Sequence, residues 1–253
     1  MSYLLPPGLA SRLRALTPAR VGLGRTGVSQ QTRDLLQFQC AHAQARDAVH
    51  ARLEAVALAA NLGAIAGSQV LRLHSAAADR TAYLQRPDLG RRLDDNSRAC
   101  LAGFANLNIG PWDLVVVVAD GLSALAVERH VPPLLNEWVP NLATGRVAPV
   151  CLVEQGRVAI ADEIGAALGA RLAVILIGER PGLSSPDSLG AYITWQPQPG
   201  RTDAERNCIS NIRTDGLSYR QAALQLNFYL TEARRCRLTG VALKQNSQLL
   251  KEG

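Results

Sequence analysis

The sequence predicts the α/β fold class: a Rossmann-like parallel sheet with flanking helices, preceded by a helical N-terminal segment. Three continuous runs of β-branched and aliphatic residues are typical of strands buried on both faces. Helical stretches alternate with these runs over short links, an order that favours right-handed crossovers within one sheet. We expect an N-terminal arm and helical region over residues 1–110 and the Rossmann-like domain over residues 111–253.

Two helices are expected before the sheet. Residues 31–60 lack Gly and Pro and place apolar residues at mixed three- and four-residue spacings, which predicts one long amphipathic helix. A turn at Gly90 leads into a second helix over residues 95–107. The motif GLGRTG, residues 22–27, has the letters of a dinucleotide-binding loop, but the preceding TPARV does not predict a strand. We therefore interpret it as a flexible turn that caps the long helix.

The remaining elements follow one another closely. WDLVVVVAD, residues 112–120, predicts the first buried strand. The next helix, within residues 121–139, is expected to break or kink at Pro132 and Pro133. After it we expect a strand over residues 148–156, a helix over 157–170, a strand over 171–179, a fourth strand over 191–197, and a helix over 217–238 with Ser218 as its N-cap.

Composition limits the kinds of partner. The net charge of +6 suggests nucleic acid, but the arginines are spread along the chain and aromatic residues do not interleave with them, so a solvated or docking surface is the better interpretation. No apolar run approaches the ~20 residues of a membrane span, and the N-terminus lacks a secretion signal. Five cysteines without a C-x-x-C pair predict reduced thiols, buried as small hydrophobes except at Cys208. We expect a cytoplasmic protein that contacts neither membrane nor nucleic acid.

No pattern for self-contained catalysis is present. Zincin, nucleophile-elbow and Walker motifs are missing, and the four histidines have no nucleophile in a recognisable setting. Asp162 and Glu163 are adjacent on a predicted helix, so we assign them to a solvated face. The sequence thus predicts no catalytic residue and no metal ligand.

The polar residues that remain follow the predicted strands. They lie in residues 119–121, 154–158 and 178–182, with the polar stretch 202–213 beside them. In doubly wound sheets ligands bind outside the carboxyl ends of the strands. The long connection after residue 178, rich in Gly, Pro and Ser, also suggests a functional loop. We expect these segments to form one rim that binds a ligand.

The same segments resemble a known family. PDLGRRL, DGLSALAV and GERPGLSSPDSLGAYITWQPQPGRTDAERNCISNIR, with TPARVGLGRTG and FQCAHAQARDAVH, look like the small subunit of ethanolamine ammonia-lyase over Thr17 to Leu243. The resemblance implies an adenosylcobalamin enzyme that converts ethanolamine to acetaldehyde and ammonia. It implies a hetero-oligomer of several large and small subunit pairs, in which the large subunit, a TIM-type barrel, binds ethanolamine and the small subunit helps to hold the cobalamin. Some members are packed into bacterial microcompartments, but the arm before Thr17 is shorter than theirs.

The resemblance also implies three cofactor contacts: Val158 in EQGRVAIADEIG, Glu179 in GERPGL and Cys208 in AERNCISN. All three fall on the expected rim. A carboxylate can accept hydrogen bonds from the amides of the cobalamin periphery, a valine offers apolar contact and a thiol is small. Each has a simpler alternative: Val158 as a core residue, Glu179 as an ion-pair partner of Arg180 or Arg206, and Cys208 as filler.

The lower cobalt ligand can be inferred from a missing motif. Many cobalamin-binding domains supply a histidine within D-x-H-x-x-G, and no histidine of this chain has that setting. We therefore expect base-on adenosylcobalamin, which keeps its own dimethylbenzimidazole. Two other classes stay open: a cobalamin- or nucleotide-binding structural adaptor without a catalytic partner, and a free-standing Rossmann-type enzyme.

Overall fold

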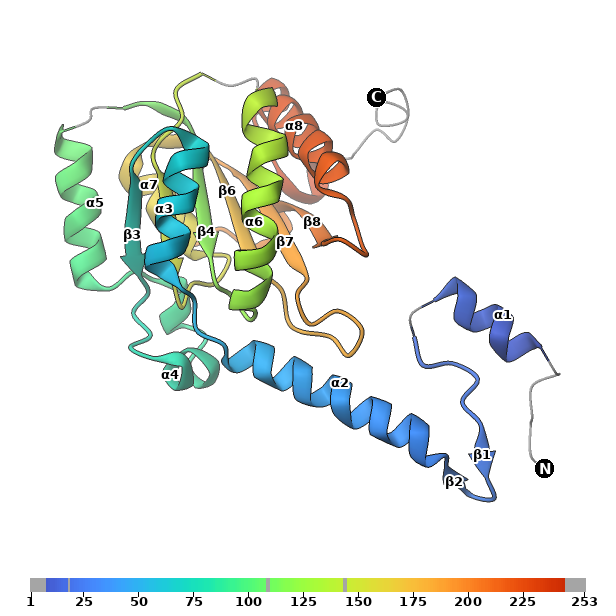
Figure 1. Ribbon diagram of the computed structural model, residues 1–253. Coiled ribbons are helices and arrows are strands. Elements are labelled where there is room, and N and C mark those ends of the chain that lie inside the picture. Colours follow the sequence, from blue (N-terminus) through green and yellow to red (C-terminus); the bar gives the residue numbers. More distant parts are fainter. Residues whose placement is uncertain (1–7, 18, 108–109, 143–144, 244–253) are drawn as a thin grey trace.

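The computed structural model describes residues 8–17, 19–107, 110–142 and 145–243. A six-stranded sheet lies between two layers of helices (Figure 1). Its strands follow the spatial order β3-β5-β4-β6-β7-β8. They are β3 Val70–His74, β4 Trp112–Ala119, β5 Val150–Glu154, β6 Ala170–Gly178, β7 Leu189–Trp195 and β8 Arg206–Ile212.

The sheet is mixed, so the predicted parallel sheet is only partly correct. The strands β3, β5, β4 and β6 are parallel to one another, whereas β7 is antiparallel to both β6 and β8. A parallel return needs a crossover of a dozen or more residues, usually with a helix. Residues 179–188 and 196–205, which precede β7 and β8, are too short for such a crossover.

Two strands of this sheet were not predicted from the sequence. β3 comes from the segment before residue 111, so the sheet is not confined to residues 111–253. β8 lies in the polar stretch 202–213, to which the sequence analysis assigned no strand. It is the edge strand, and only part of it is buried, so its side chains do not show the apolar run of an internal strand.

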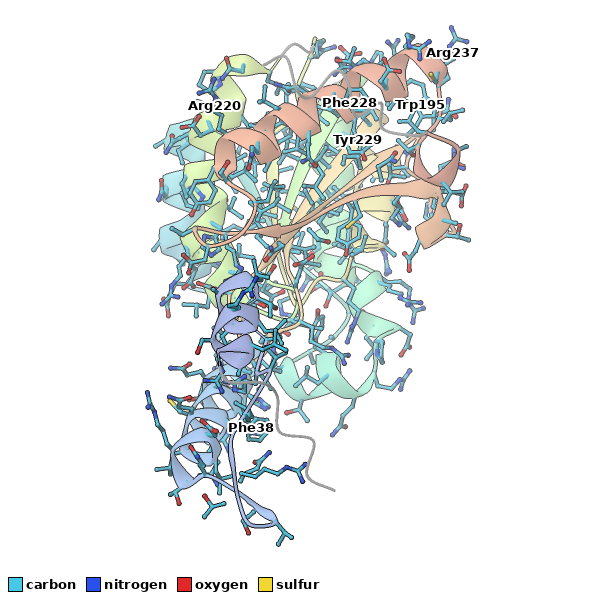
Figure 2. The ribbon with its side chains drawn as sticks, turned by 90° about the vertical axis from the view of Figure 1, so that its right-hand side faces the viewer. Phe38, Trp195, Arg220, Phe228, Tyr229 and Arg237 are labelled. Atoms are coloured by element: carbon cyan, nitrogen blue, oxygen red, sulfur yellow. The ribbon has the colours of Figure 1, made fainter. Side chains whose placement is uncertain are left out.

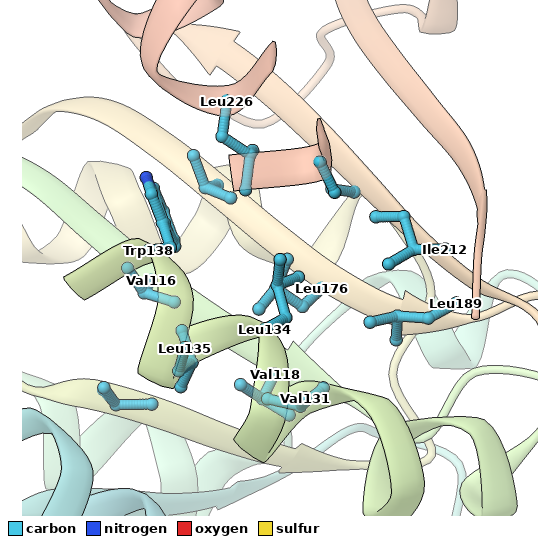
Figure 3. Close-up of a cluster of buried hydrophobic side chains, with 14 of the residues drawn as sticks. Val116, Val118, Val131, Leu134, Leu135, Trp138, Leu176, Leu189, Ile212 and Leu226 are labelled. Carbon is cyan, nitrogen blue, oxygen red and sulfur yellow. The ribbon is translucent and has the colours of Figure 1, made fainter. Parts of the chain in front are cut away.

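Helices cover the two faces of the sheet unequally. On one face α3 Ala55–Ala66, α6 Ala124–Trp138 and α8 Tyr219–Cys236 pack against alternate residues of β4, including Val116 and Val118. Figure 3 shows the side chains of this cluster around α6 and β6. On the other face α5 Asp95–Leu107 and α7 Ile160–Leu168 pack against the intervening residues, including Val115 and Val117. Burial on both faces explains the continuous valine run of β4.

The N-terminal part extends away from these layers (Figure 1). It contains α1 Leu9–Leu16, a hairpin of β1 Arg25–Thr26 and β2 Ser29–Gln30, and α2 Thr32–His50. The GLGRTG motif forms part of the hairpin, with Gly27 at φ +63°, and the N-cap of α2 is Gln31. The motif is therefore a turn, as expected, but it does not itself cap the helix.

The expected long helix over residues 31–60 is wrong, because it is two helices. α2 ends at His50, α3 begins at Ala55, and their axes differ by 79°. Three tertiary contacts stabilise the break: Arg80 Nε donates to the Val49 carbonyl at 2.7 Å, the Glu54 N–H donates to the Glu128 carboxylate at 2.8 Å, and Leu53 is buried. Among the described residues no single helix is long and apolar enough to cross a membrane; only the bent pair α2 and α3, taken together, meets that test of length and composition.

The expected break at the two prolines does not occur, since α6 runs through Pro132 and Pro133. These residues remove two helical hydrogen-bond donors. Burial of apolar side chains on the same turns offsets this loss of hydrogen bonds, because Val131, Leu134 and Trp138 are fully buried against the sheet. Predictions for α5 and α8 are confirmed, including Ser218, whose side chain accepts from the Gln221 N–H.

Asp162 is not on a solvated face, contrary to the expectation. Its side chain is 1% exposed and makes a two-pronged ion pair with the equally buried Arg206, with both N–O distances 2.7 Å. Arg206 also donates to Thr194 Oγ1 and the Arg201 carbonyl. This network fastens α7 to the antiparallel edge of the sheet. Glu163 is engaged as well, because it accepts from the Leu93 N–H and from Arg98.

We predict that Asp162→Ala lowers the free energy of unfolding by about 3–5 kcal/mol, because it leaves the Arg206 guanidinium buried without its counter-ion. Asp203→Ala is the matched control. Asp203 also pairs with Arg206, at 3.5 Å, but its side chain is 92% exposed, so its loss should cost about 1 kcal/mol or less. Urea denaturation measures both; equal losses in the two variants would contradict the prediction.

Candidate functional site

A pocket of about 820 Å³ opens at the carboxyl ends of β4, β5 and β6. β4 and β6 are neighbours whose connections leave in opposite directions, since β4 leads to β5 and β6 leads to β7. Such a reversal leaves a crevice at the strand ends of an open α/β sheet. The pocket is lined by Tyr83, Arg91, Gly121, Leu122, Arg157, Val158, Ala159, Ile177, Gly178, Glu179, Arg180, Tyr192, Arg201, Thr202 and Asp203.

Two glycines let the chain pass closely at the floor of this pocket. Gly121 has φ +56°, and a Cβ on it would lie 2.3 Å from the Gly178 carbonyl oxygen. A Cβ on Gly178 would lie 2.1 Å from the Ser123 carbonyl oxygen. The Leu122 N–H donates to the Gly178 carbonyl at 2.9 Å. The segments that leave β4 and β6 are therefore in backbone contact, which only glycine permits here.

One wall of the pocket is built around Tyr83. Its ring lies between the guanidinium groups of Arg80 and Arg157, whose carbons are 4.7 and 4.4 Å from the ring centroid. The Tyr83 hydroxyl donates to the Gly156 carbonyl, and Arg157 donates to the Tyr83 carbonyl. Burial is the main cause that raises the pKa of Tyr83. The tyrosine is therefore a neutral positioning group that fixes Arg157 at the edge of the pocket.

Asp120 and Arg80 connect the segments beneath the pocket. Asp120 accepts from the Gly156 N–H at 3.1 Å, and its carboxylate lies 3.6 Å from Arg80. Arg80 also donates to the Gly121 carbonyl, at 2.8 Å. Burial raises the pKa of Asp120 from its ordinary value of 3.8 to about 6, although the positive charge of Arg80 opposes the rise.

The structure brings two of the three predicted contact residues into the pocket. Val158 is half-buried before the first turn of α7 and packs against the core of that face. Glu179 follows β6 and accepts from the Ser188 hydroxyl and from the Asn211 N–H, the latter at 3.3 Å. Glu179 is thus held by polar neighbours and not by the ion pairs considered as its alternative.

Cys208 lies at the margin and does not line the pocket. It is exposed on β8, directly opposite Tyr192 of β7, and Tyr192 does line the pocket. The Cys208 thiol is 3.3 Å from Ser210 Oγ. Of the other cysteines, Cys151 is buried as expected, whereas Cys40 and Cys100 are exposed, contrary to the expectation.

Sequence reasoning missed several pocket residues. Arg157 and Arg180 lie in the predicted rim segments 154–158 and 178–182, but they were not singled out as ligand contacts. Tyr83 and Arg91 come from the segment before β4 and carried no sequence signal for this position. The pocket lining therefore carries more positive than negative charge: four arginines, Arg91, Arg157, Arg180 and Arg201, lie around the carboxylates of Glu179 and Asp203. Among the described residues no group of three or more His, Cys, Asp or Glu side chains is arranged to hold a metal ion.

Fold and site together define a three-layer α/β protein with an open ligand pocket at the carboxyl ends of its parallel strands. Comparison with known proteins then identifies the family: the chain belongs to the ethanolamine ammonia-lyase light-chain family, whose model matches residues 9–244. This confirms the resemblance found in the sequence.

Individual relatives agree with the family assignment, and those named here are ethanolamine ammonia-lyase small subunits. The protein from Pseudomonas fluorescens Pf-5 is 59% identical over 239 residues, 94% of this chain and 87% of the relative. That from Pseudomonas syringae pv. tomato is 57% identical, over 94% of this chain and 83% of the relative. That from Pseudomonas fluorescens SBW25 is 58% identical over 247 residues, 97% and 89% of the two chains.

The raised pKa of Asp120 predicts a pH-dependent stability. Because the folded protein holds this proton more tightly than the unfolded chain, the contribution of Asp120 to stability is present below pH 3.8 and is lost as the pH rises through about 6. A difference of about 2 in pKa corresponds to about 3 kcal/mol. The free energy of unfolding of Asp120→Asn, relative to the wild type, should therefore increase by about that amount across this interval, as measured by urea titrations at several pH values.

Asp187→Asn is a control of opposite sign. Burial raises the pKa of Asp187, but the hydrogen bond from Arg129 and the nearby His130 outweigh it, and the net pKa is lowered. Its contribution is therefore present above the unfolded value and lost as the pH falls. The stability of Asp120→Asn relative to the wild type could instead stay constant with pH, or change with pH in the same direction as that of Asp187→Asn. Either result would contradict the raised pKa of Asp120.

Proposed function

We propose that this chain is the small subunit of an adenosylcobalamin-dependent ethanolamine ammonia-lyase and that its pocket holds part of the cobalamin. The large subunit, a TIM-type barrel, binds ethanolamine in this proposal. The observation that carries it is the meeting of Val158 and Glu179 in one pocket at the point where the strand connections reverse. These residues follow two different strands; the rim predicted from the strand ends contains both, and the family resemblance singled them out as cofactor contacts.

The pocket residues suit the chemistry of cobalamin. The periphery of that cofactor carries neutral amides, which both donate and accept hydrogen bonds. Glu179 can accept from an amide N–H, a charge-assisted bond. Arg157 Nε is buried without a hydrogen-bond partner among the described residues, so it can donate to an amide oxygen. Val158, Leu122 and Ile177 add apolar surface around these polar groups. The site therefore fits a large ligand with mixed apolar and amide surface.

The division of labour follows from what the pocket lacks. Bound adenosylcobalamin supplies the radical chemistry. The residues of this chain that line the pocket bind and orient the ligand and exclude water from one side of it. None of the four histidines lines the pocket, which supports a base-on cofactor that keeps its own dimethylbenzimidazole. We assign no catalytic residue to this chain.

Two surface features support a large partner. The pocket is open to solvent. An adjoining pocket of about 480 Å³, between α2 and the loop after β6, shares Leu122 and Arg180 with it. Along α2, large apolar side chains are exposed, namely Leu35, Leu36 and Phe38. Figure 2 shows Phe38 on this projecting segment. Exposed apolar surface on a segment that projects from the sheet is typical of a protein interface. A hetero-oligomer of large and small subunits, located in the cytoplasm or in a microcompartment, is part of the proposal.

Reconstitution tests the proposal. The purified chain should show no ammonia-lyase activity, whereas mixing it with the large subunit and adenosylcobalamin should produce acetaldehyde and ammonia from ethanolamine. The visible spectrum should report cofactor binding in the complex. With nitrogen-15 protein and unlabelled cofactor, the cob(II)alamin resonance should keep the axial splitting of nitrogen-14. Turnover by the chain alone would favour a free-standing enzyme, and cofactor binding without turnover in the complex would favour the structural adaptor.

The contribution of Glu179 can be measured separately. In the reconstituted complex, Glu179→Ala should weaken adenosylcobalamin binding by about 1.5–3 kcal/mol, the usual value of a hydrogen bond to a charged group. Glu154→Ala is the matched control, because Glu154 ends β5 but does not line the pocket, and it should leave the affinity unchanged. Spectroscopic titration with the cofactor decides; an unaltered affinity of Glu179→Ala would remove this residue from the site.

A further inference from the structure

A second pocket, of about 420 Å³, lies at the opposite end of the sheet. It is lined by Asp113, Arg171, Trp195, Gln196, Arg234 and Arg237. Arg171 is the second residue of β6 and Glu179 follows its last residue, so the strand separates the two pockets by roughly 26 Å at about 3.3 Å per residue. Figure 2 shows Trp195 and Arg237 together at the end of α8, far from Phe38. The second pocket is therefore independent of the proposed cobalamin site.

The pocket carries more positive than negative charge. Three guanidinium groups line it, and among the described residues Asp113 is the only carboxylate that does so. Asp113 is itself engaged, because it accepts from Arg171 at 3.2 Å and from the Arg146 N–H at 2.9 Å. Burial lowers the pKa of Arg234, and the carboxylate of Asp113 only partly offsets this effect. An anion bound in this pocket would face three guanidinium groups.

The helix dipole explains why one arginine lies at the C-terminal end of α8, but it does not explain the arginines that line the pocket. Arginines in the last turn of a helix interact favourably with its dipole. Arg235 fits this account, since it pairs with Glu232 of the same helix at 2.6 Å and does not line the pocket. Arg234 and Arg237 instead line the pocket with Arg171, which belongs to a different element. Their convergence is a tertiary feature.

The backbone around this pocket is also unusual. Among the described residues four non-glycine residues have positive φ, a conformation that costs energy and gathers at functional sites. Two lie beside the first site: Gln155 precedes Gly156, and the Asn211 N–H donates to Glu179. The other two, Gln196 at +45° and Arg237 at +55°, line the second pocket. Arg237 is the left-handed C-cap of α8, a common helix ending, so Gln196 is the unusual residue here.

We propose that this second pocket binds a nucleotide, with its phosphate held by Arg234, Arg237 and Arg171 and its base against Trp195. Guanidinium groups match phosphate oxygens with two parallel hydrogen bonds. The indole of Trp195, half-buried against the core, offers a flat apolar surface for a base. The volume lies within the range of small-molecule sites, about 300–1,000 Å³.

Calorimetric titration of the full chain with ADP, pyrophosphate and adenosine tests the proposal. ADP should bind more tightly than either fragment. Arg234→Gln and Arg237→Gln should each weaken ADP binding about tenfold or more, the loss expected for a hydrogen bond to a charged group. Arg235→Gln, which removes the same charge from the same helix end, should leave the affinity within about twofold. Trp195→Leu should weaken ADP binding but not pyrophosphate binding.

Three results would overturn the proposal. The first is the absence of ADP binding at millimolar concentration, with circular dichroism showing a folded wild-type chain. The second is an equal loss in Arg235→Gln, which would mean a diffuse charge effect. The third is a loss in Arg157→Gln with none in Arg237→Gln, which would place the nucleotide in the first pocket. Arg237 is exposed and ends its helix, so Arg237→Gln should fold and keeps the test decisive.

Discussion

The buried contact between Arg80 and Asp120 is the constraint on which the candidate site depends. Arg80 reaches the end of α2 through the Val49 carbonyl and the end of β4 through Gly121, while Asp120 holds the N–H of Gly156 after β5. Arg80 and Asp120 are 8% and 2% exposed, so their charges act in a medium that screens them little. Segments from four parts of the chain are thereby fixed beneath one pocket, and the projecting helix α2 is joined to it mechanically.

The loop after β6 is braced in a similar way. Its Asp187 pairs with Arg129 at 2.9 Å and lies 3.4 Å from Nε2 of His130, a side chain whose pKa burial lowers. The Ser123 hydroxyl, which also caps α6, donates to the Pro186 carbonyl. A polar loop with two prolines thus has a defined path over the sheet. This order explains how Glu179, at the start of the loop, can present its carboxylate in one position, and why a ligand need not order the loop itself.

Much of the fold could be predicted because local pattern and burial agree there. In the valine run of β4 and in the helices α5 and α8, the hydrophobic pattern along the sequence matches the side chains that are buried. All three elements were predicted. The errors occur where distant contacts override that pattern. The helix over residues 31–60 breaks because Arg80 and Glu128 bind its backbone, and Asp162 is buried because Arg206, 44 residues later, neutralises it. The sequence around Asp162 contains no trace of that partner.

The sequence by itself determined the three parallel strands β4, β5 and β6, the rim at their carboxyl ends and the family. These depend on runs of neighbouring residues, whose hydrophobic pattern and order are present in the chain before it folds. Only the tertiary structure decided the antiparallel edge, the wall around Tyr83, the position of Cys208 outside the pocket and the arginine-lined pocket at the far end. The physical reason is that charge pairing and close packing act between residues that the chain connectivity keeps far apart, so their partners appear only once the layers have assembled.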